Sequence, residues 1–260
     1  MNIAVLIKHV VDSTEVRFDK KSGELRLRGL PEKISDYDKH AIEAAVQIKA
    51  KHGGKVTAIS FGTKDALKSL KEAVALGADE GVLVHHAQAG ELYDPILVAQ
   101  VLAKATGHLG GFDLVLSGSM TEDVTNKIVG SAVASYLNLP YLSNVSKLAV
   151  EEGGYVSATS EIDGWEVETK SRLPIALSVM RKLNEPRLAT KIQIMKVPMK
   201  ALSTVSLGDI GMSEELSTIA GFEVASFTPI PSDRKRIIIE DEVQAGVGKL
   251  VGFLREEGVL

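Results

Sequence analysis

Short runs of apolar, largely β-branched residues alternate with segments of helical periodicity along most of this chain. The runs fall at residues 3–7, 56–60, 81–84, 114–117 and 176–179, and each is short enough to be a buried strand. Between them, apolar residues recur every three or four positions around residues 41–48, 67–76 and 96–105, which predicts helices with one buried face. Strand followed by helix, repeated, indicates βαβ units. The order therefore predicts an α/β fold with a mostly parallel sheet flanked by helices.

Local signals at the expected helix ends agree with this order. Ser35 and Asp36 are placed to cap the first helix, Thr63 is placed to cap the second, and glycines follow both helices, at Gly53-Gly54 and Gly77. Two β-hairpins are expected as additions to the sheet, 16–18 against 25–27 around a turn at 21–23, and 147–150 against 155–159. A further turn between two strands, at 161–166, carries the single tryptophan, Trp165, which we expect at an edge or an interface.

The composition changes near residue 196. Serine, threonine, proline and charged residues become frequent, and the scattered apolar residues, among them Phe222 and Phe227, do not make a core until a helix expected at 243–256. We therefore divide the chain into an α/β domain, residues 1–200, and a C-terminal arm, residues 201–260, that packs on a partner subunit.

Composition and motifs exclude several classes of function. The 30 basic and 34 acidic residues give a net charge of −4, so no nucleic-acid partner is expected. Cysteine is absent, which excludes disulfides, thiolate metal sites and cysteine nucleophiles, and the six histidines lack zinc-site spacing. Glycine-rich dinucleotide and P-loop motifs and the serine-hydrolase elbow are missing as well. The lack of cysteine and of zinc-site histidine spacing also means that no metal site is expected. With neither a signal peptide nor a span of about 18 apolar residues, the chain is expected to be cytoplasmic, without membrane insertion.

One loop is the strongest candidate for a ligand site. Ligands of open parallel sheets bind beyond the carboxyl ends of the strands. Residues 118–127 follow the strand at 114–117 and lead into a helix expected to begin near Asn126, with Gly130 on its first turn. Free backbone N–H groups, with Thr125, Asn126 and Lys127, suit a phosphate, while an ordinary polar loop with a capped helix is an equal alternative. Residues 183–195 are expected to form an exposed loop or short helix, either a docking element or a surface connection.

Ordered blocks of residues resemble the beta subunit of electron transfer flavoproteins over essentially the whole chain. The opening 5–12, the helix start at 35–45, and the blocks 59–62 and 73–79 follow that family's order. The most specific blocks are Glu161-Ile162-Asp163-Gly164, Leu173-Pro174, Asn184-Glu185-Pro186-Arg187 and Ile194-Met195-Lys196. The resemblance implies a Rossmann-like, adenine-nucleotide-binding sheet with added hairpins and an extended C-terminal arm.

The resemblance also implies cofactors, partners and site residues. An alpha subunit would complete a heterodimer and hold the redox-active FAD, while the beta site would hold AMP or, in members that bifurcate electrons, a second FAD. The implied nucleotide contacts are Leu6, Ser35, Asp36, Tyr37, Asp38, Phe61, Gly118, Ser119, Met120, Thr121, Glu122, Asp123, Val124, Thr125, Asn126, Lys127, Ile128 and Val129. The implied docking residues are Arg187, Leu188, Thr190, Lys191, Ile192 and Met195.

The chain departs from the family pattern at both places. Ile128 replaces a polar residue of the nucleotide loop, Lys191 replaces a leucine anchor, and the lysine cluster that follows is thinned to Lys196 and Lys200. We expect an electron carrier that takes electrons from flavin dehydrogenases, such as acyl-CoA dehydrogenases, and passes them to a membrane quinone oxidoreductase. No residue is expected to act as a catalytic acid, base or nucleophile, because the flavin does the chemistry. A bifurcating flavoprotein subunit and a stand-alone adenine-nucleotide sensor are the alternatives.

Overall fold

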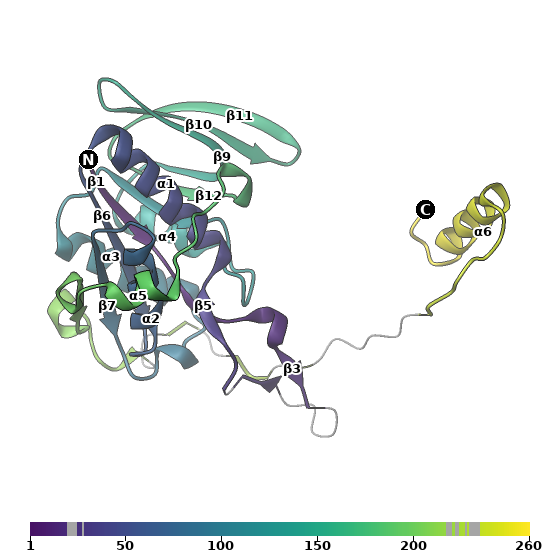
Figure 1. Cartoon of the computed structure of the whole chain (residues 1–260), viewed down its shortest axis with the longest axis horizontal. Coiled ribbons are helices and arrows are strands. Elements are labelled where there is room, and N and C mark those ends of the chain that lie inside the picture. The colour runs from purple at the N-terminus through teal and green to yellow at the C-terminus, as the bar shows by residue number, and fades with distance from the viewer. Residues whose placement is uncertain (20–24, 28, 217–219, 222–223, 227, 229–234) are drawn as a thin grey trace. The chain divides into compact units, whose positions relative to one another are not determined.

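The computed structural model describes the chain apart from residues 20–24, 28, 217–219, 222–223, 227 and 229–234 (Figure 1). Contacts within the chain divide it into two units, Met1–Phe227 and Thr228–Leu260. The hairpin turn predicted at residues 21–23, and the tail residues Phe222 and Phe227, lie outside the described residues.

A nine-stranded sheet forms the centre of the first unit, in the order β11-β10-β9-β12-β8-β1-β6-β7-β13. Neighbouring strands in the part β9-β12-β8-β1-β6-β7-β13 are parallel to one another. Strand β10 pairs antiparallel with β9, and β11 pairs antiparallel with β10, so these two strands add an antiparallel edge. The predicted strands and the α/β class are confirmed. The strand bounds are β1 (Asn2–Leu6), β6 (Lys55–Gly62), β7 (Glu80–His85), β8 (Leu114–Gly118), β9 (Tyr141–Glu151), β10 (Tyr155–Ile162), β11 (Trp165–Arg172), β12 (Ile175–Val179) and β13 (Leu202–Val205).

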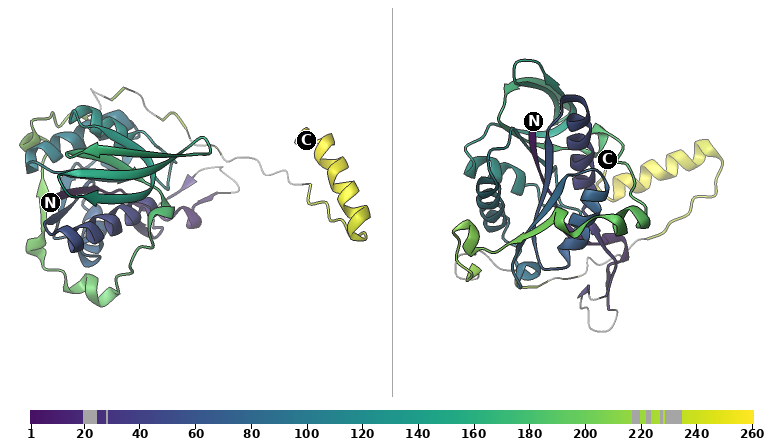
Figure 2. Two further views of the ribbon diagram at one scale, coloured as in Figure 1. Left: turned by 90° about the horizontal axis from the view of Figure 1, so that it is seen from above. Right: turned by 60° about the vertical axis from the view of Figure 1, so that its left-hand side comes forward.

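Helices cover both faces of this sheet, as Figure 2 shows. Side chains alternate along β1, so that Ile3 and Val5 pack with the helices on one face, while Ala4 and Leu6 pack with those on the other. The first face carries α1 (Asp36–His52) and α2 (Ala66–Ala75), and the second carries α3 (Pro95–Leu109) and α4 (Val129–Tyr136). A core on both faces explains why the strand sequences are continuous apolar runs.

Three of the predicted helix ends differ in detail. Ser35 precedes α1, but its hydroxyl accepts a hydrogen bond from Glu122 N, 87 residues away, and does not cap its own helix. The predicted cap of α2 was wrong, because Asp65 precedes that helix and Thr63 contributes only its carbonyl oxygen, to Ala66 N. Helix α4 begins at Val129, later than the predicted start near residue 126, because the chain before it folds as a hydrogen-bonded loop.

Both predicted hairpins and the turn at Trp165 are confirmed. Strands β3 (Arg17–Phe18) and β4 (Leu25–Arg26) pair as a small ribbon, β9 pairs with β10, and Trp165 opens β11 directly after the β10 turn. A second ribbon joins β2 (His9–Val11) to β5 (Glu32–Ile34). The other short elements are α5 (Lys191–Lys196) and the 3₁₀ turns η1 (Ser13–Glu15), η2 (Ala89–Glu91), η3 (Arg181–Leu183), η4 (Met199–Ala201) and η5 (Gly208–Ile210).

The C-terminal arm contains residues of both units. In the first unit, β13 pairs with β7, and Leu207, Ile210 and Leu216 are buried in the core beside α3. The second unit contains the predicted helix, α6 (Val243–Glu256), on which Val243, Val247 and Leu250 are exposed. Packing of this arm on a partner chain stays a prediction. Among the described residues, the structure has no helix with the length and apolar character needed to cross a membrane.

Candidate functional site

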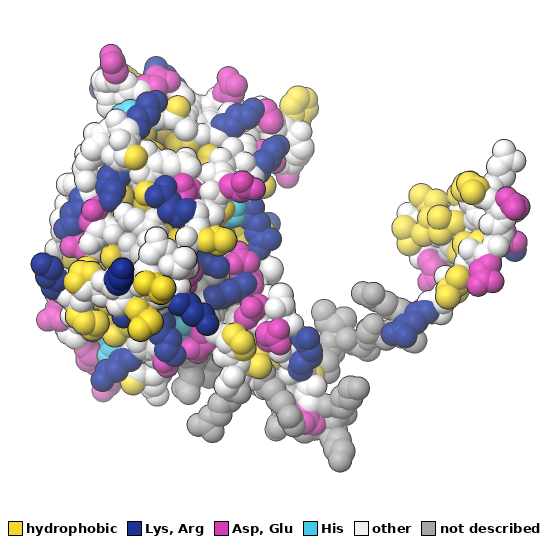
Figure 3. Space-filling model, in the orientation of Figure 1, with side chains coloured by type: hydrophobic (Ala, Val, Ile, Leu, Met, Phe, Trp, Pro, Cys, Tyr) yellow, Lys and Arg dark blue, Asp and Glu magenta, His cyan; other side chains and the backbone are white. Residues whose placement is uncertain are grey.

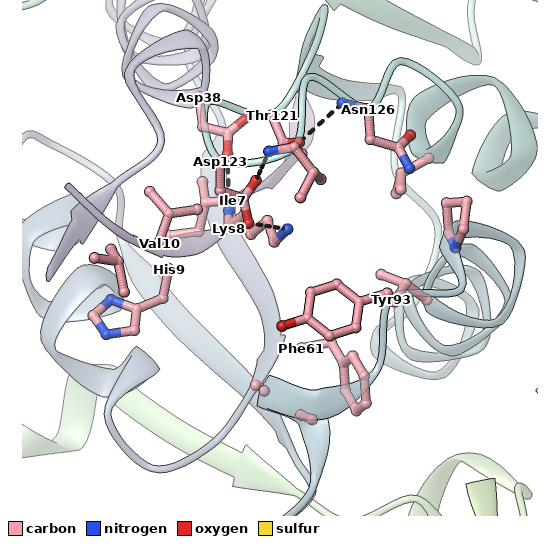
Figure 4. Close-up of a pocket in the computed structure, with 18 of the residues that line it drawn as sticks. Ile7, Lys8, His9, Val10, Asp38, Phe61, Tyr93, Thr121, Asp123 and Asn126 are labelled. Carbon is pink, nitrogen blue, oxygen red and sulfur yellow. Dashed lines mark hydrogen bonds and ion pairs between the residues drawn. The ribbon is translucent and has the colours of Figure 1, made fainter. Parts of the chain in front are cut away.

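A cavity of about 560 Å³ opens beyond the carboxyl ends of the central strands. The parallel register places β1 between β6 and β8, so the residues that follow these three strands meet at one edge of the sheet. Figure 4 shows Asp38, Asp123, Thr121 and Asn126 together, while Phe61 and Tyr93 belong to another part of the wall. The cavity therefore has a polar part and an aromatic part, at the place where the strand-end rule predicts a ligand.

Asp38 ties the ends of two strands to the first turn of α1. Its buried carboxylate accepts hydrogen bonds from Lys8 N, at 2.8 Å, and from Gly118 N, at 3.0 Å. Burial raises the pKa of Asp38 to about 7, although these two N–H groups act in the opposite direction. Gly118 has to be glycine here, because a Cβ would lie 2.6 Å from Asp38 Oδ1 and 2.6 Å from Tyr37 Cβ.

The loop between β8 and α4 is held by its own hydrogen bonds. Thr121 N donates to Asn126 O at 2.9 Å, Asn126 N donates to Thr121 Oγ1 at 3.1 Å, and Thr125 adopts the left-handed conformation that this tight loop needs. Glu122 turns away from the cavity and accepts from Lys33 Nζ, at 2.9 Å, and from the backbone of α1. The loop is therefore ordered from within and fastened to α1.

The N-terminus of α4 carries a second unusual feature. The hydroxyl of Ser117, a residue that is only 8% exposed, has no hydrogen-bond partner in the described part of the chain. It points at the first turn of α4, since a Cβ on Gly130 would lie 2.6 Å from Ser117 Oγ. A helix N-terminus presents backbone N–H groups that favour an anion, and an unused buried hydroxyl beside it adds a donor. The residues present fit a phosphate group.

The charges around the polar part leave little repulsion toward an anion. Two carboxylates lie there and would repel a phosphate, but Lys8 Nζ lies 2.6 Å from Asp123 Oδ2 and neutralises it. The raised pKa of Asp38 reduces the second negative charge near neutral pH. No group of three metal-ligating side chains occurs in the part of the chain that the structure describes.

The predicted nucleotide contacts fall into two sets. Those that line the cavity are Leu6, Asp38, Phe61, Gly118, Met120, Thr121, Asp123, Val124, Asn126, Lys127 and Val129. The others are not among its lining residues: Ser35, Asp36, Tyr37, Ser119, Glu122, Thr125 and Ile128. Ser35 and Asp36 hold Glu122, Tyr37 packs under the Arg181 guanidinium at 4.5 Å, and the Ile128 side chain is exposed. A nucleotide-binding role for these residues stays a prediction.

Several lining residues were missed. Lys8 and His9 directly follow the first predicted strand, so their position gave a signal, whereas Tyr93 comes from an irregular link before α3 that has no sequence signature. His9 Nδ1 lies 2.7 Å from Ser69 Oγ, and its Nε2 lies 3.2 Å from Glu32 Oε2. These contacts connect α2 with the β2–β5 ribbon. Because Ser69 is buried, its hydroxyl is not accessible as a nucleophile.

Residues 187–196, which contain the predicted docking residues and are called the docking segment below, form an exposed ridge. Thr190 starts α5 with a reciprocal capping pair, since its Oγ1 accepts from Gln193 N and its N donates to Gln193 Oε1. Leu188 is 91% exposed, and Ile192 and Met195 are also exposed. Where Figure 1 places α5, Figure 3 shows hydrophobic side chains gathered among those of Lys and Arg. An exposed apolar ridge with basic neighbours is typical of a protein-docking surface.

Comparison with known proteins gives a consistent result. Residues 25–208 match the model of the electron transfer flavoprotein domain. The chain is 31% identical over 257 residues to the electron transfer flavoprotein subunit beta of Bacillus subtilis, covering 99% of this chain and 98% of that protein. It is 38% identical over 188 residues to the same subunit of Thermoanaerobacterium thermosaccharolyticum, covering 72% and 71%. It is 30% identical over 264 residues to the caffeyl-CoA reductase-Etf complex subunit CarD of Acetobacterium woodii, covering all of both chains.

Proposed function

This chain belongs to the electron transfer flavoprotein family, within which it matches the beta subunit, and from that premise we propose that it binds AMP and forms half of a heterodimeric electron carrier. An alpha subunit holds the FAD, whose isoalloxazine ring accepts and releases single electrons when bound. The present chain supplies a nucleotide site and a docking surface. None of its side chains needs to exchange a proton with a substrate.

The buried Ser117 hydroxyl facing the start of α4 is the observation that carries the AMP proposal. It offers an unused donor beside backbone N–H groups, and Asn126 and Lys127 line the same polar part of the cavity. We assign the phosphate of AMP to this position and the adenosine to the apolar wall that includes Leu6 and Phe61. AMP bound there ties the loop 118–130 to the sheet and takes no part in electron transfer.

A second FAD in place of AMP is the second candidate, and the apolar extension of the cavity supports it. Beyond the polar part, the cavity continues along Tyr93, Val10 and Phe18, which gives an apolar wall suited to a flat ring system. A heterodimer with two flavins, one in each subunit, would support electron bifurcation. The relative from Acetobacterium woodii is a subunit of a reductase complex, so the family includes larger assemblies.

The docking segment supports a carrier over a stand-alone nucleotide sensor. We propose that flavin dehydrogenases, such as those that oxidise acyl-CoA, dock on the apolar ridge of Leu188, Ile192 and Met195, and that a membrane quinone oxidoreductase receives the electrons. The exposed apolar stripe of α6, with Val243, Val247 and Leu250, supports packing on the alpha subunit. A cytoplasmic location fits these partners.

Removing single hydroxyls tests the nucleotide site. Ser117→Ala should weaken AMP binding about tenfold or more, because a hydrogen bond to a charged group is worth about 1.5–3 kcal/mol. Ser60→Ala is the matched control, since Ser60 Oγ is also buried with no hydrogen-bond partner among the described residues but belongs to the opposite, α1–α2 face of the sheet. Titration calorimetry with AMP measures both variants. Equal affinities in the two variants would contradict the assignment of the phosphate.

A charge placed on the ridge tests docking. Ile192→Asp should slow electron transfer from an acyl-CoA dehydrogenase reduced by its acyl-CoA substrate, because a carboxylate enters the apolar centre of the contact. Ile96→Asp places the same charge on another exposed isoleucine, on α3, and should not change the rate. Stopped-flow measurement at several dehydrogenase concentrations separates weaker docking from slower transfer. Unaltered kinetics in Ile192→Asp would remove the docking role.

A further inference from the structure

Helix α1 contacts both the nucleotide loop and the base of the docking segment. Its first turn faces the loop between β8 and α4, and its second turn, with His40 and Glu43, faces residues 184–187. The two regions lie far apart in the sequence and share this one helix, whose apolar side, including Ala41, Ile42 and Ala45, is buried in the core.

The contacts with the nucleotide loop involve backbone and side chains. Ser35 Oγ accepts a hydrogen bond from Glu122 N at 3.3 Å, and Asp36 N donates to Glu122 Oε2 at 3.2 Å. The Asp38 carboxylate accepts from Gly118 N at 3.0 Å, where the loop begins. A ligand that restrains this loop further therefore also restrains the first turn of α1.

Two pairs of residues join α1 to residues 184–187, at the base of the docking segment. His40 Nδ1 lies 3.0 Å from Asn184 O, and Asn184 Nδ2 donates to His40 O at 3.0 Å. Arg187 donates to the Glu43 carboxylate through Nε at 2.7 Å, Nη2 at 3.0 Å and its backbone N at 3.2 Å.

The Glu43–Arg187 pair is well placed to hold the base of the segment. The Glu43 side chain is 7% exposed, and burial alone would raise its pKa. The hydrogen bonds from Arg187 and Gln47 and the charge of Arg187 together more than offset this effect, so the pKa of Glu43 lies below its usual value and the carboxylate stays charged. The exposed ridge begins at the next residue, Leu188.

Resting on the nucleotide and docking roles proposed above, we propose that α1 couples the two sites, so that nucleotide bound in the cavity stabilises the docking segment through Glu43 and Arg187. Glu43 follows Asp36 by seven residues, which is about two turns or 10 Å along a helix axis. A helix packed on one face moves as a unit over this length, so a first turn held by the loop also fixes Glu43. By linkage, a dehydrogenase bound to the segment raises the affinity for the nucleotide by the same factor.

Hydrogen exchange of residues 188–196 measures this coupling in the complete chain co-expressed with the alpha subunit. After removal of bound nucleotide, saturating AMP should slow exchange in this segment about fivefold or more. Glu43→Gln, which keeps the shape of the side chain and removes its charge, should abolish most of that response. Asn184→Ala should reduce it through the neighbouring pair. Glu166→Gln removes a carboxylate of β11 from its exposed pair with Lys147 of β9 and should keep the full response.

The outcomes separate this coupling from the function on which it rests. If calorimetry shows that AMP binds but hydrogen exchange of residues 188–196 does not change, the coupling is overturned and the nucleotide site stays in place. A full AMP response in Glu43→Gln would also overturn it, because the signal would then reach the segment by another route. If AMP does not bind the unmodified complex, the proposed nucleotide site falls and the coupling falls with it.

Discussion

Replacing Gly118 by alanine tests whether the close approach of β8 to α1 builds the site. The added methyl group would lie 2.6 Å from Asp38 Oδ1, 2.6 Å from Tyr37 Cβ and 3.0 Å from the Tyr37 carbonyl carbon. Because Tyr37 is fixed in α1, the strand end and the helix have to separate. Such overpacking costs about 1–3 kcal/mol, and the hydrogen bond from Gly118 N to the Asp38 carboxyl group, now 3.0 Å, is worth about 0.5–1.5 kcal/mol when the carboxyl is protonated.

We therefore expect Gly118→Ala to lower the free energy of unfolding by about 1.5–4.5 kcal/mol, which for a chain of this size lowers Tm by roughly 5–15 °C. AMP affinity should fall as well, because the loop that begins at Gly118 moves away from α1. Gly107→Ala is the matched control: its methyl group meets nothing within 4 Å, and alanine inside α3 should stabilise by about 0.5–1 kcal/mol. Urea and thermal unfolding measure both variants. A Gly118→Ala variant as stable as the unmodified protein would refute the reasoning.

Two further substitutions test the site and the C-terminal arm. The folded protein holds the Asp38 proton up to about pH 7, whereas the unfolded chain releases it near 3.8, so the free energy of unfolding should fall as pH rises between these values, by about 1.4 kcal/mol per unit of pKa difference. Asp38→Asn should lack this part of the pH dependence in urea titrations, and an unchanged pH profile would contradict the burial of the carboxyl. Asp94→Ala removes the acceptor of the hydrogen bonds from Ile96 N and Gly221 N. It should lower the free energy of unfolding by about 1–3 kcal/mol and speed hydrogen exchange at Gly221. Unchanged exchange at Gly221 would show that Asp94 does not hold the arm.

The main elements of the fold could be predicted because burial on both faces makes each central strand a continuous apolar run. The pairing of β2 with β5 could not, since His9–Val11 and Glu32–Ile34 are too short to show a pattern. Strand β13 was missed for a related reason: Leu202–Val205 lies just after the change in composition, yet it completes the edge beside β7.

The place of the cavity could be predicted, but not the direction of each side chain. The strand-end rule selected the edge of the sheet at which the cavity opens, because the rule depends on topology alone. Which residues face the cavity depends on long-range partners, as Glu122 shows: Lys33 and the start of α1 draw it away from the cavity. Ser117 was assigned to the strand, and its unused hydroxyl becomes visible only when α4 packs beside it.

The nucleotide content of the purified complex tests the central claim most directly. The complete chain is co-expressed with its alpha subunit, and the bound nucleotides are released by denaturation, separated by chromatography and quantified against the protein. We predict one FAD and one AMP per heterodimer, with the AMP reduced in the Ser117→Ala complex. Two FAD and no AMP would contradict the carrier function and establish the bifurcating alternative.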